Sequence, residues 1–123
     1  MKSYRDVLVN QHATIKEALS IIDKGAIRIA IVIDDNEKVV GTLSDGDIRR
    51  GLLNGLTLDS SIENLYFKEP TIANINDSKE LIIQKAIRKQ IYQIPIVDDE
   101  GKLVKIEDLA KLLKTNAKQI VSF

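Results

Sequence analysis

The feature that most constrains the fold of this chain is an internal repeat with an offset of 64 residues. Residues 29–40, IAIVIDDNEKVV, align with residues 93–104, QIPIVDDEGKLV, so apolar positions fall on apolar positions and one Asp-Asp pair falls on the other. A unit of roughly 55 residues buries too little surface to be stable alone. We therefore expect the two copies to pack together into one pseudo-symmetric body.

Each copy predicts the same order of elements, which is a lead strand, a helix, two strands and a second helix. In the first copy, Thr14 followed by Glu17 is typical of a capped helix start, and in the second copy Ser78 or Asp77 has the same role. Each helix is followed by an apolar run of strand length, an acidic turn and a second short apolar run. The second helices are expected over about 47–53 and 107–114. The pattern predicts an α+β fold.

The repeat also predicts the limits of the parts. The expected parts are a first unit over 1–58, a linker over 59–69, a shortened second unit over 70–115 and a tail over 116–123. Within the linker, Ser60 and Glu63 have the spacing of a capping box, which predicts a short helix near 61–65.

Composition excludes several classes of function. The chain has 18 Lys plus Arg and 18 Asp plus Glu, so it lacks the long-range attraction that nucleic-acid and anionic-membrane binders use. It has no cysteine and one histidine, which excludes disulfides, thiolate sites and His clusters. That histidine, His12, lies in a polar connector and is expected to be merely exposed. We predict no catalytic residue, no metal site and no required cofactor, and hence no enzyme.

The chain also lacks the sequence signals of membrane insertion and secretion. Its longest apolar run, over 29–33, is far shorter than the roughly 20 residues of a membrane span. Its N-terminus has no apolar segment of the signal-peptide kind. We therefore predict a cytoplasmic location with no membrane partner.

Three motifs carry a resemblance to a known family. They are Thr14-x-x-Glu17-Ala18, the run AIVID over 30–34, and GTLSDGDI over 41–48, and the related run IPIVD recurs over 94–98. Together they resemble the cystathionine β-synthase (CBS) domain, and the repeat resembles a CBS-domain pair, or Bateman module, over about 4–114. The resemblance implies two pseudo-symmetric β-α-β-β-α units that pack through their sheets.

One segment narrows the resemblance. Residues 44–55, SDGDIRRGLLNG, look most like CBS pairs attached to sugar nucleotidyltransferases, and a similar segment follows sugar-phosphate isomerase domains. A module that begins at Met1 favours the first of these. The resemblance implies a regulatory module that binds AMP, ADP or ATP and controls an attached or partner enzyme. A ligand-free dimerisation scaffold and a feedback sensor for nucleotide sugars are the alternatives.

The same resemblance implies a ligand site in the cleft between the units. Asp47 matches the family aspartate that accepts hydrogen bonds from ribose hydroxyls, and Ser44 matches the Ser or Thr three residues before it. Judged from the residues alone, both side chains could equally be helix caps. Arg50 lies on the same helix face as Asp47 and is the better phosphate candidate, whereas Arg49 is expected in a solvated or inter-subunit ion pair. The full predicted set is Val9, Thr14, Ala30, Ile31, Val32, Ser44, Asp45, Gly46, Asp47 and Arg50.

Some members of this set also have a purely structural interpretation. Ala30, Ile31 and Val32 match the strand that walls the adenine, but an apolar strand is equally core. Val9 and Thr14 flank the lead segment, and Thr14 is also the predicted cap of the first helix.

The second copy predicts no equivalent site. Asp34 and Asp47 are 13 residues apart, whereas Asp98 and Asp108 are 10 apart, which suggests a deletion of three residues at the binding motif. Lys105 replaces a glycine and is expected at the surface, or else near anions in the cleft. We therefore predict one nucleotide per chain.

Leucines in the second helices predict self-association. These helices carry more apolar side chains than one face can bury in a small unit, and exposed apolar patches usually mark contacts. Relatives form two-fold dimers through the corresponding helices. The prediction is a homodimer with Leu52, Leu53, Leu112 or Leu113 near the interface, unless these leucines complete the core of their own unit.

Overall fold

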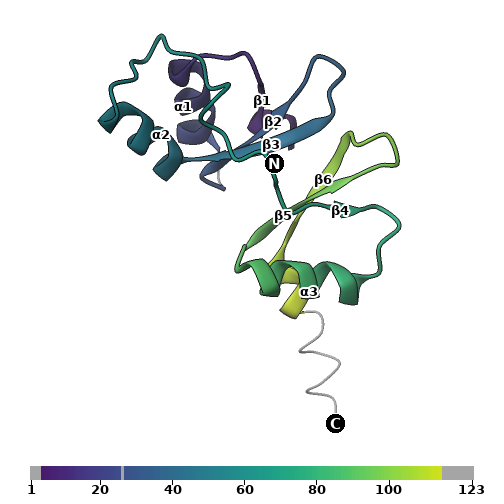
Figure 1. Cartoon of the computed structure of the whole chain (residues 1–123). Coiled ribbons are helices and arrows are strands. Elements are labelled where there is room, and N and C mark those ends of the chain that lie inside the picture. The colour runs from purple at the N-terminus through teal and green to yellow at the C-terminus, as the bar shows by residue number, and fades with distance from the viewer. Residues whose placement is uncertain (1–3, 26, 115–123) are drawn as a thin grey trace. The chain divides into compact units, whose positions relative to one another are not determined.

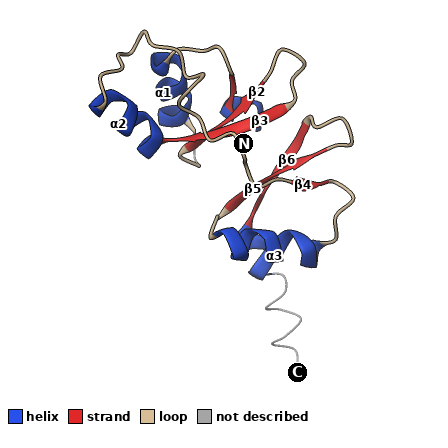
Figure 2. Ribbon diagram, viewed as in Figure 1, coloured by secondary structure: helices blue, strands red, loops and turns tan. Residues whose placement is uncertain are grey.

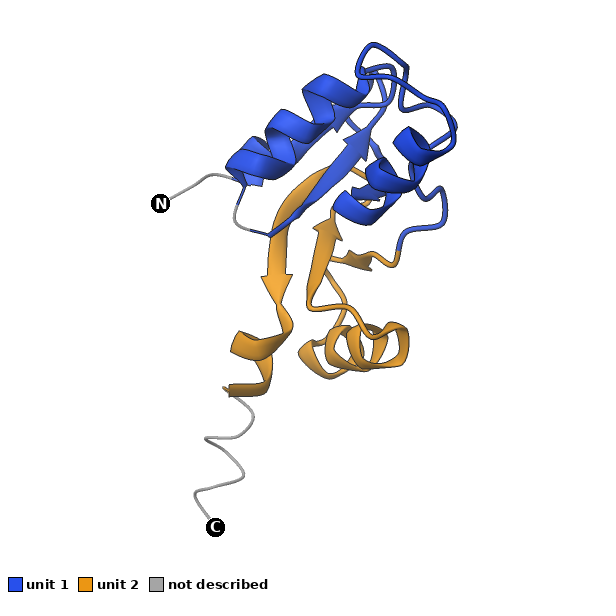
Figure 3. Ribbon diagram, turned by 90° about the vertical axis from the view of Figure 1, so that its left-hand side faces the viewer, with its two compact units in different colours: residues 1–70 blue, residues 71–123 orange. Residues whose placement is uncertain are grey.

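The computed structural model describes residues 4–25 and 27–114. The chain divides into two compact units, residues 1–70 and 71–123 (Figure 3). Each unit has its own three-stranded sheet with helices, so the predicted α+β class is confirmed (Figure 2). No helix in the described ranges has both the length and the apolar character needed to cross a membrane.

Unit 1 follows the predicted order of elements (Figure 1). A 3-10 turn, η1 (Tyr4–Val7), leads into β1 (Leu8–Asn10), α1 (Ile15–Lys24), β2 (Ile29–Ile33), β3 (Val39–Ser44) and α2 (Asp45–Leu53). The sheet order is β1-β2-β3, with β1 parallel to β2 and β3 antiparallel to it. The parallel pair is possible because α1 provides the crossover between β1 and β2.

Periodicity explains the core of unit 1. Ile15, Ala18 and Ile22 recur at helical spacing on α1, and all three are buried. They pack with Ala30 and Val32, which alternate along β2 toward the same face of the sheet. This core fixes α1 against the sheet and so positions the α1–β2 loop beside the start of α2.

The segment over 56–67, which we call the strap, packs on unit 1 although the sequence predicts most of it to be a linker. Ile62 is fully buried in the core, and its N–H donates to the carbonyl of Ala13 over 2.9 Å. The N–H of Ile15 has no acceptor within the first turn of α1, and it donates to the carbonyl of Ser60. At the far end, Phe67 forms two backbone hydrogen bonds with Thr42, at the otherwise open edge of β3.

The prediction of a short helix over 61–65 is wrong, because that stretch forms only a turn. The expected capping box does not form, since the Ser60 hydroxyl accepts a hydrogen bond from the N–H of Thr57 instead. Long-range pairing of this backbone with the loop before α1 replaces the local helical bonds.

Unit 2 repeats the order with shorter elements. It consists of β4 (Ala73–Asn74), α3 (Lys79–Lys89), β5 (Gln93–Val97) and β6 (Leu103–Asp108), followed by a helix that covers residues 109–114. The sheet order is β4-β5-β6. The last helix begins at 109 rather than 107, because Glu107 and Asp108 still pair with β5.

Strand register corrects the predicted deletion in the second unit. Ile29 pairs with Ser44 in unit 1, and Gln93 pairs with Asp108 in unit 2, so both hairpins have the same length. Even the register shift recurs, after Val32 and after Ile96. At the constant offset of 64 residues, Asp108 therefore corresponds to Ser44, and no residue is missing.

Candidate functional site

The start of α2 holds the most concentrated group of predicted ligand residues. The Ser44 hydroxyl accepts a hydrogen bond from the N–H of Asp47 over 3.1 Å, and Asp47 Oδ2 accepts one from the N–H of Ser44 over 3.0 Å. This reciprocal pair is a capping box. The capping interpretation of both residues is therefore present in the structure, whatever else they bind.

Asp47 retains capacity for further hydrogen bonds. Its Oδ1 accepts from Nη2 of Arg50 over 2.6 Å, so each carboxylate oxygen has one partner among the described residues. An ionised carboxylate offers about four acceptor positions, which leaves room for two hydroxyl donors. The Asp47 side chain is 22% exposed and the Arg50 side chain 68%, so a ligand could reach both. Arg49 instead pairs with Asp45 over 2.8 Å along the helix.

Gly46 adds an open stretch of backbone. A Cβ built at Gly46 would meet no atom closer than Nη1 of Arg50 at 3.5 Å, so packing within unit 1 does not require glycine there. Glycine is also unfavourable within a helix. The N–H groups of Asp45 and Gly46 lie in the first turn and have no acceptor inside the helix, and such groups favour anions.

The remaining predicted residues belong to the framework of unit 1. Val9, Ala30 and Val32 lie in its hydrophobic core, and Ile31 is buried on the opposite face of β2. The Thr14 hydroxyl caps α1 by accepting from the N–H of Glu17 over 3.2 Å.

Strand pairing shows which of these lie near the start of α2. Ala30 pairs with Leu43, beside Ser44, whereas Val32 pairs with Val9 and Gly41, three residues back along β3. Val9 is also two strands away from β3, so with about 3.3 Å per strand residue and about 4.8 Å per strand spacing it lies roughly 14 Å from the capping box.

Arg28 is a residue near the start of α2 that was not predicted from the sequence. Arg28 has a left-handed backbone, with φ of 60°, and lines a pocket of unit 1 together with Asp45. No local motif marks a left-handed arginine, because glycine and asparagine are the usual signals.

Unit 2 lacks the carboxylate of the candidate site. Asp108 Oδ1 accepts from the N–H of Ala110 over 2.9 Å, so Asp108 caps the last helix as Ser44 caps α2. Lys111 occupies the position equivalent to Asp47. Nζ of Lys105 pairs with Glu107 over 2.8 Å.

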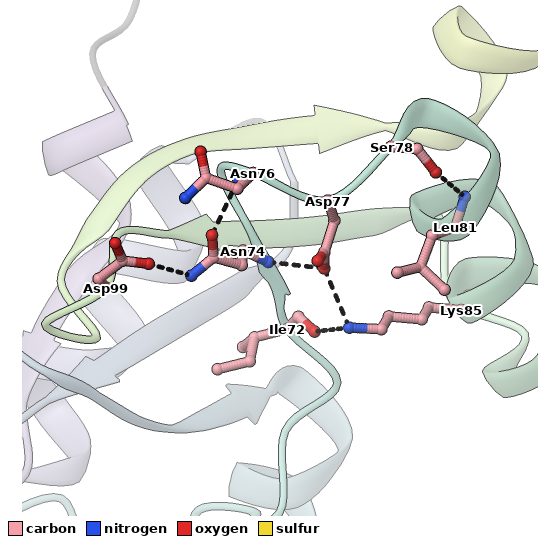
Figure 4. A network of polar contacts seen from close by, with 8 residues as sticks. All are labelled: Ile72, Asn74, Asn76, Asp77, Ser78, Leu81, Lys85 and Asp99. Atoms are coloured by element: carbon pink, nitrogen blue, oxygen red, sulfur yellow. Dashed lines mark hydrogen bonds and ion pairs between the residues drawn. The ribbon is translucent and has the colours of Figure 1, made fainter.

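Unit 2 has a polar network of its own around Asp77 (Figure 4). Asp77 Oδ2 accepts from the N–H of Asn74 over 2.9 Å and from Nζ of Lys85 over 3.2 Å, and Lys85 also donates to the carbonyl of Ile72. The bond from the backbone of Asn74 and the ammonium of Lys85 together hold the pKa of Asp77 below its ordinary value. The network ties α3 to the short strand β4.

Two other features bear on chemistry. Nδ1 of His12 lies 2.9 Å from Oε1 of Glu63, so the predicted exposed histidine contacts the strap while more than half of its side chain stays accessible. Within residues 4–25 and 27–114, no three His, Asp or Glu side chains are grouped closely enough to hold a metal ion.

Comparison with known proteins shows which family the first unit resembles. Residues 3–54 match the family model of the CBS domain. An uncharacterised protein of Helicobacter pylori is 31% identical over 112 residues, which cover 90% of this chain and 34% of that protein. The arabinose 5-phosphate isomerase GutQ of Escherichia coli is 28% identical over 95 residues, covering 74% of this chain and 28% of the isomerase. The chain thus spans about a third of the length of these relatives.

Solved structures share the fold over nearly the whole chain. A CBS domain pair/ACT domain protein from Thermotoga maritima is 24% identical, with a TM-score of 0.77 and coverage of 97% of this chain and 98% of that one. A CBS domain protein from Pyrobaculum aerophilum, solved in complex with AMP, is 20% identical, with a TM-score of 0.75 and coverage of 96% and 99%. Both units together therefore have the fold of a CBS-domain pair.

Proposed function

We propose that this CBS-domain pair is a regulatory module that binds one adenine nucleotide at the start of α2. The observation that carries the proposal is the group formed by Ser44, Gly46, Asp47 and Arg50, which combines acceptors for hydroxyl groups, free amides and a cation within the first two turns of α2. The Asp47 carboxylate would accept the ribose hydroxyls, while Arg50 and the amides of the first turn would hold the phosphate. The AMP complex of a structural relative supports this ligand class.

The regulated enzyme is proposed to act on sugar phosphates or nucleotide sugars. The segment SDGDIRR resembles that of CBS pairs attached to sugar nucleotidyltransferases, which is our first candidate for the attached or partner enzyme. A sugar-phosphate isomerase is the second candidate, because the chain is similar to part of GutQ. In both cases the pair itself performs no catalysis and works from the cytoplasm.

Calorimetric titration tests the nucleotide site. AMP, ADP, ATP and a set of nucleotide sugars are each titrated into the parent chain, and the tightest ligand is then titrated into Asp47→Ala. We expect an affinity 10- to 150-fold lower, equivalent to roughly 1.5–3 kcal/mol for lost charge-assisted bonds.

The control separates ligand contact from helix capping. Ser78 caps α3 in the same way, through a bond to the N–H of Leu81, and lies in the other unit. Ser78→Ala should lower the free energy of unfolding by about 1 kcal/mol, as loss of a helix cap does, and should leave the nucleotide affinity unchanged. Equal nucleotide affinity for Asp47→Ala and the parent would refute the assignment of Asp47, and tighter binding of a nucleotide sugar would favour the feedback-sensor alternative.

A further inference from the structure

A pocket of about 210 Å³ in unit 1 is not explained by the proposed nucleotide site. It lies at the C-terminal end of α1, beside the loop that leads into β2, and Asp45 of α2 closes one side. Its apolar part comes from α1. The lining residues are Leu19, Ile22, Asp23, Gly25, Arg28 and Asp45.

The charges around this pocket do not neutralise one another pairwise. Asp45 is paired with Arg49. In contrast, Asp23 and Arg28 form no ion pair or side-chain hydrogen bond with any other described residue. The pocket therefore presents one unpaired carboxylate and one unpaired guanidinium above an apolar surface.

The backbone around the pocket also favours a ligand that carries both charges. Arg28 has φ of 60°, which costs a residue with a Cβ free energy that glycine would not lose, and such strain is typical of functional positions. The last turn of α1 ends at Lys24, so its free carbonyls form the negative end of the helix dipole, which attracts cations. A ligand with both charges would be bound at both ends.

We propose that this pocket binds a free α-amino acid with an aliphatic side chain. The ammonium group would face Asp23 and the carbonyls that end α1, the carboxylate would pair with Arg28, and the side chain would lie on Leu19 and Ile22. The volume supports a ligand of this size, because sites for larger organic ligands measure about 300–1,000 Å³. The unpaired charges exclude a simple hydrocarbon.

The amino-acid site is distinct from the nucleotide site. Asp45 and Asp47 are two residues apart on α2, so at about 100° per residue they lie on nearly opposite sides of the helix. Asp45 lines the pocket, whereas Asp47 binds Arg50. The two ligands are therefore expected to bind without competition.

Three probes of nearly equal shape test the proposal by calorimetric titration. They are L-leucine, 4-methylpentanoate, which lacks the ammonium group, and isopentylamine, which lacks the carboxylate. L-Leucine should bind, and each of the other two should bind at least about tenfold more weakly, since each loses a charge-assisted contact. Equal binding of all three, or no binding of L-leucine at millimolar concentration, would overturn the proposal.

Two variants assign the charges to residues. Arg28→Gly removes the guanidinium and relieves the backbone strain, so the chain should remain at least as stable to heat while its affinity for L-leucine falls about tenfold or more. Asp23→Asn should weaken L-leucine and leave isopentylamine no better bound than 4-methylpentanoate. Arg88→Gln, on α3 of unit 2, is the matched control and should leave the affinity unchanged. Displacement of L-leucine by AMP would show one shared site and contradict the separate pocket.

Discussion

Gly41 and Gly46 lie five residues apart in unit 1, but their surroundings differ. A Cβ at Gly41 would overlap the ring of Tyr66 and the carbonyl oxygen of Phe67, both at the end of the strap. At Gly46 the same atom would make only ordinary contacts. Close approach of the strap therefore explains why residue 41 is a glycine. Packing within unit 1 does not explain why residue 46 is one.

We predict opposite effects of alanine at the two positions. Gly41→Ala should lower the free energy of unfolding by about 1–3 kcal/mol, because the strap must shift. Gly46→Ala should leave it unchanged or raise it by up to about 1 kcal/mol, because alanine favours helix. Urea unfolding measures both. If Gly46→Ala leaves AMP affinity at the parent value, the open backbone there has no part in binding.

Asp77 carries a prediction about pH. Its pKa is lower in the folded state than its ordinary value near 3.8, so its network stabilises the fold above that value. The stabilisation is lost as the pH falls through the lower folded pKa. Asp77→Asn should remove this part of the pH dependence in urea unfolding measured between neutral pH and acid. Asp59→Asn, in the strap, is the control, and identical acid profiles for Asp77→Asn and the parent would contradict the role of Asp77.

At the scale of elements, the strap distinguishes unit 1 from unit 2. Its Ile62 packs into the core between α1 and the sheet, and its Phe67 pairs with Thr42 at the edge of β3. The equivalent of Gly41 in β6 is Lys105, which pairs with Glu107. Charged side chains on an edge strand discourage pairing with another chain, so β3 and β6 have differently protected edges.

Removing the buried side chain of the strap should destabilise unit 1. Ile62→Ala is expected to cost about 2–5 kcal/mol in urea unfolding, through lost burial and the cavity left behind. Hydrogen exchange at the amide of Thr42 should become faster, because that amide donates to Phe67. Ile75→Ala, at an exposed position of unit 2, should change stability by no more than about 0.5 kcal/mol. An effect of Ile62→Ala as small as that of Ile75→Ala would mean that the strap is only a linker.

At the scale of the whole molecule, the two units predict one nucleotide per chain. Unit 1 has Asp47 at the start of its second helix, and the equivalent position in unit 2 is Lys111. A lysine cannot accept hydrogen bonds from ribose hydroxyls. Titration with AMP should therefore reach saturation at one equivalent, and Lys111→Asp is the variant to test for a gained second site. Two equivalent sites in the parent chain would contradict this prediction.

Exposed leucines predict that the whole molecule is a homodimer. Leu53 is 80% exposed and Leu52 and Leu113 are about half as exposed, whereas Leu112 packs against the core of unit 2. Leu52 and Leu53 at the end of α2, and Leu113 in the last helix of unit 2, are therefore the side chains expected to self-associate. Light scattering at micromolar concentration should give about 28 kDa, twice the chain mass of 13.8 kDa. Leu53→Ser should give the monomer mass while the control Ile87→Ser does not, and a parent chain at 13.8 kDa would refute the dimer.

The sequence by itself determined the features that depend on near neighbours. Helix caps at Thr14, Ser44 and Ser78 bind groups only three residues away, so their spacing is readable from the chain. The period of apolar residues likewise predicted the order of helices and strands, and the repeat predicted two similar units. The capping box of Ser44 and Asp47, which belongs to the candidate nucleotide site, likewise joins residues only three apart in the sequence.

Only the tertiary structure decided the features that depend on distant segments. The strap binds Ala13 and Thr42 from residues 62 and 67, and no local pattern distinguishes such backbone pairing from a linker. Counting residues from one aspartate to the next misaligned Asp108, because the register of a hairpin is fixed by cross-strand pairs rather than by spacing along the chain. The left-handed Arg28 and the pocket beside it arise for the same reason, since α1, β2 and α2 meet there only after the unit has folded.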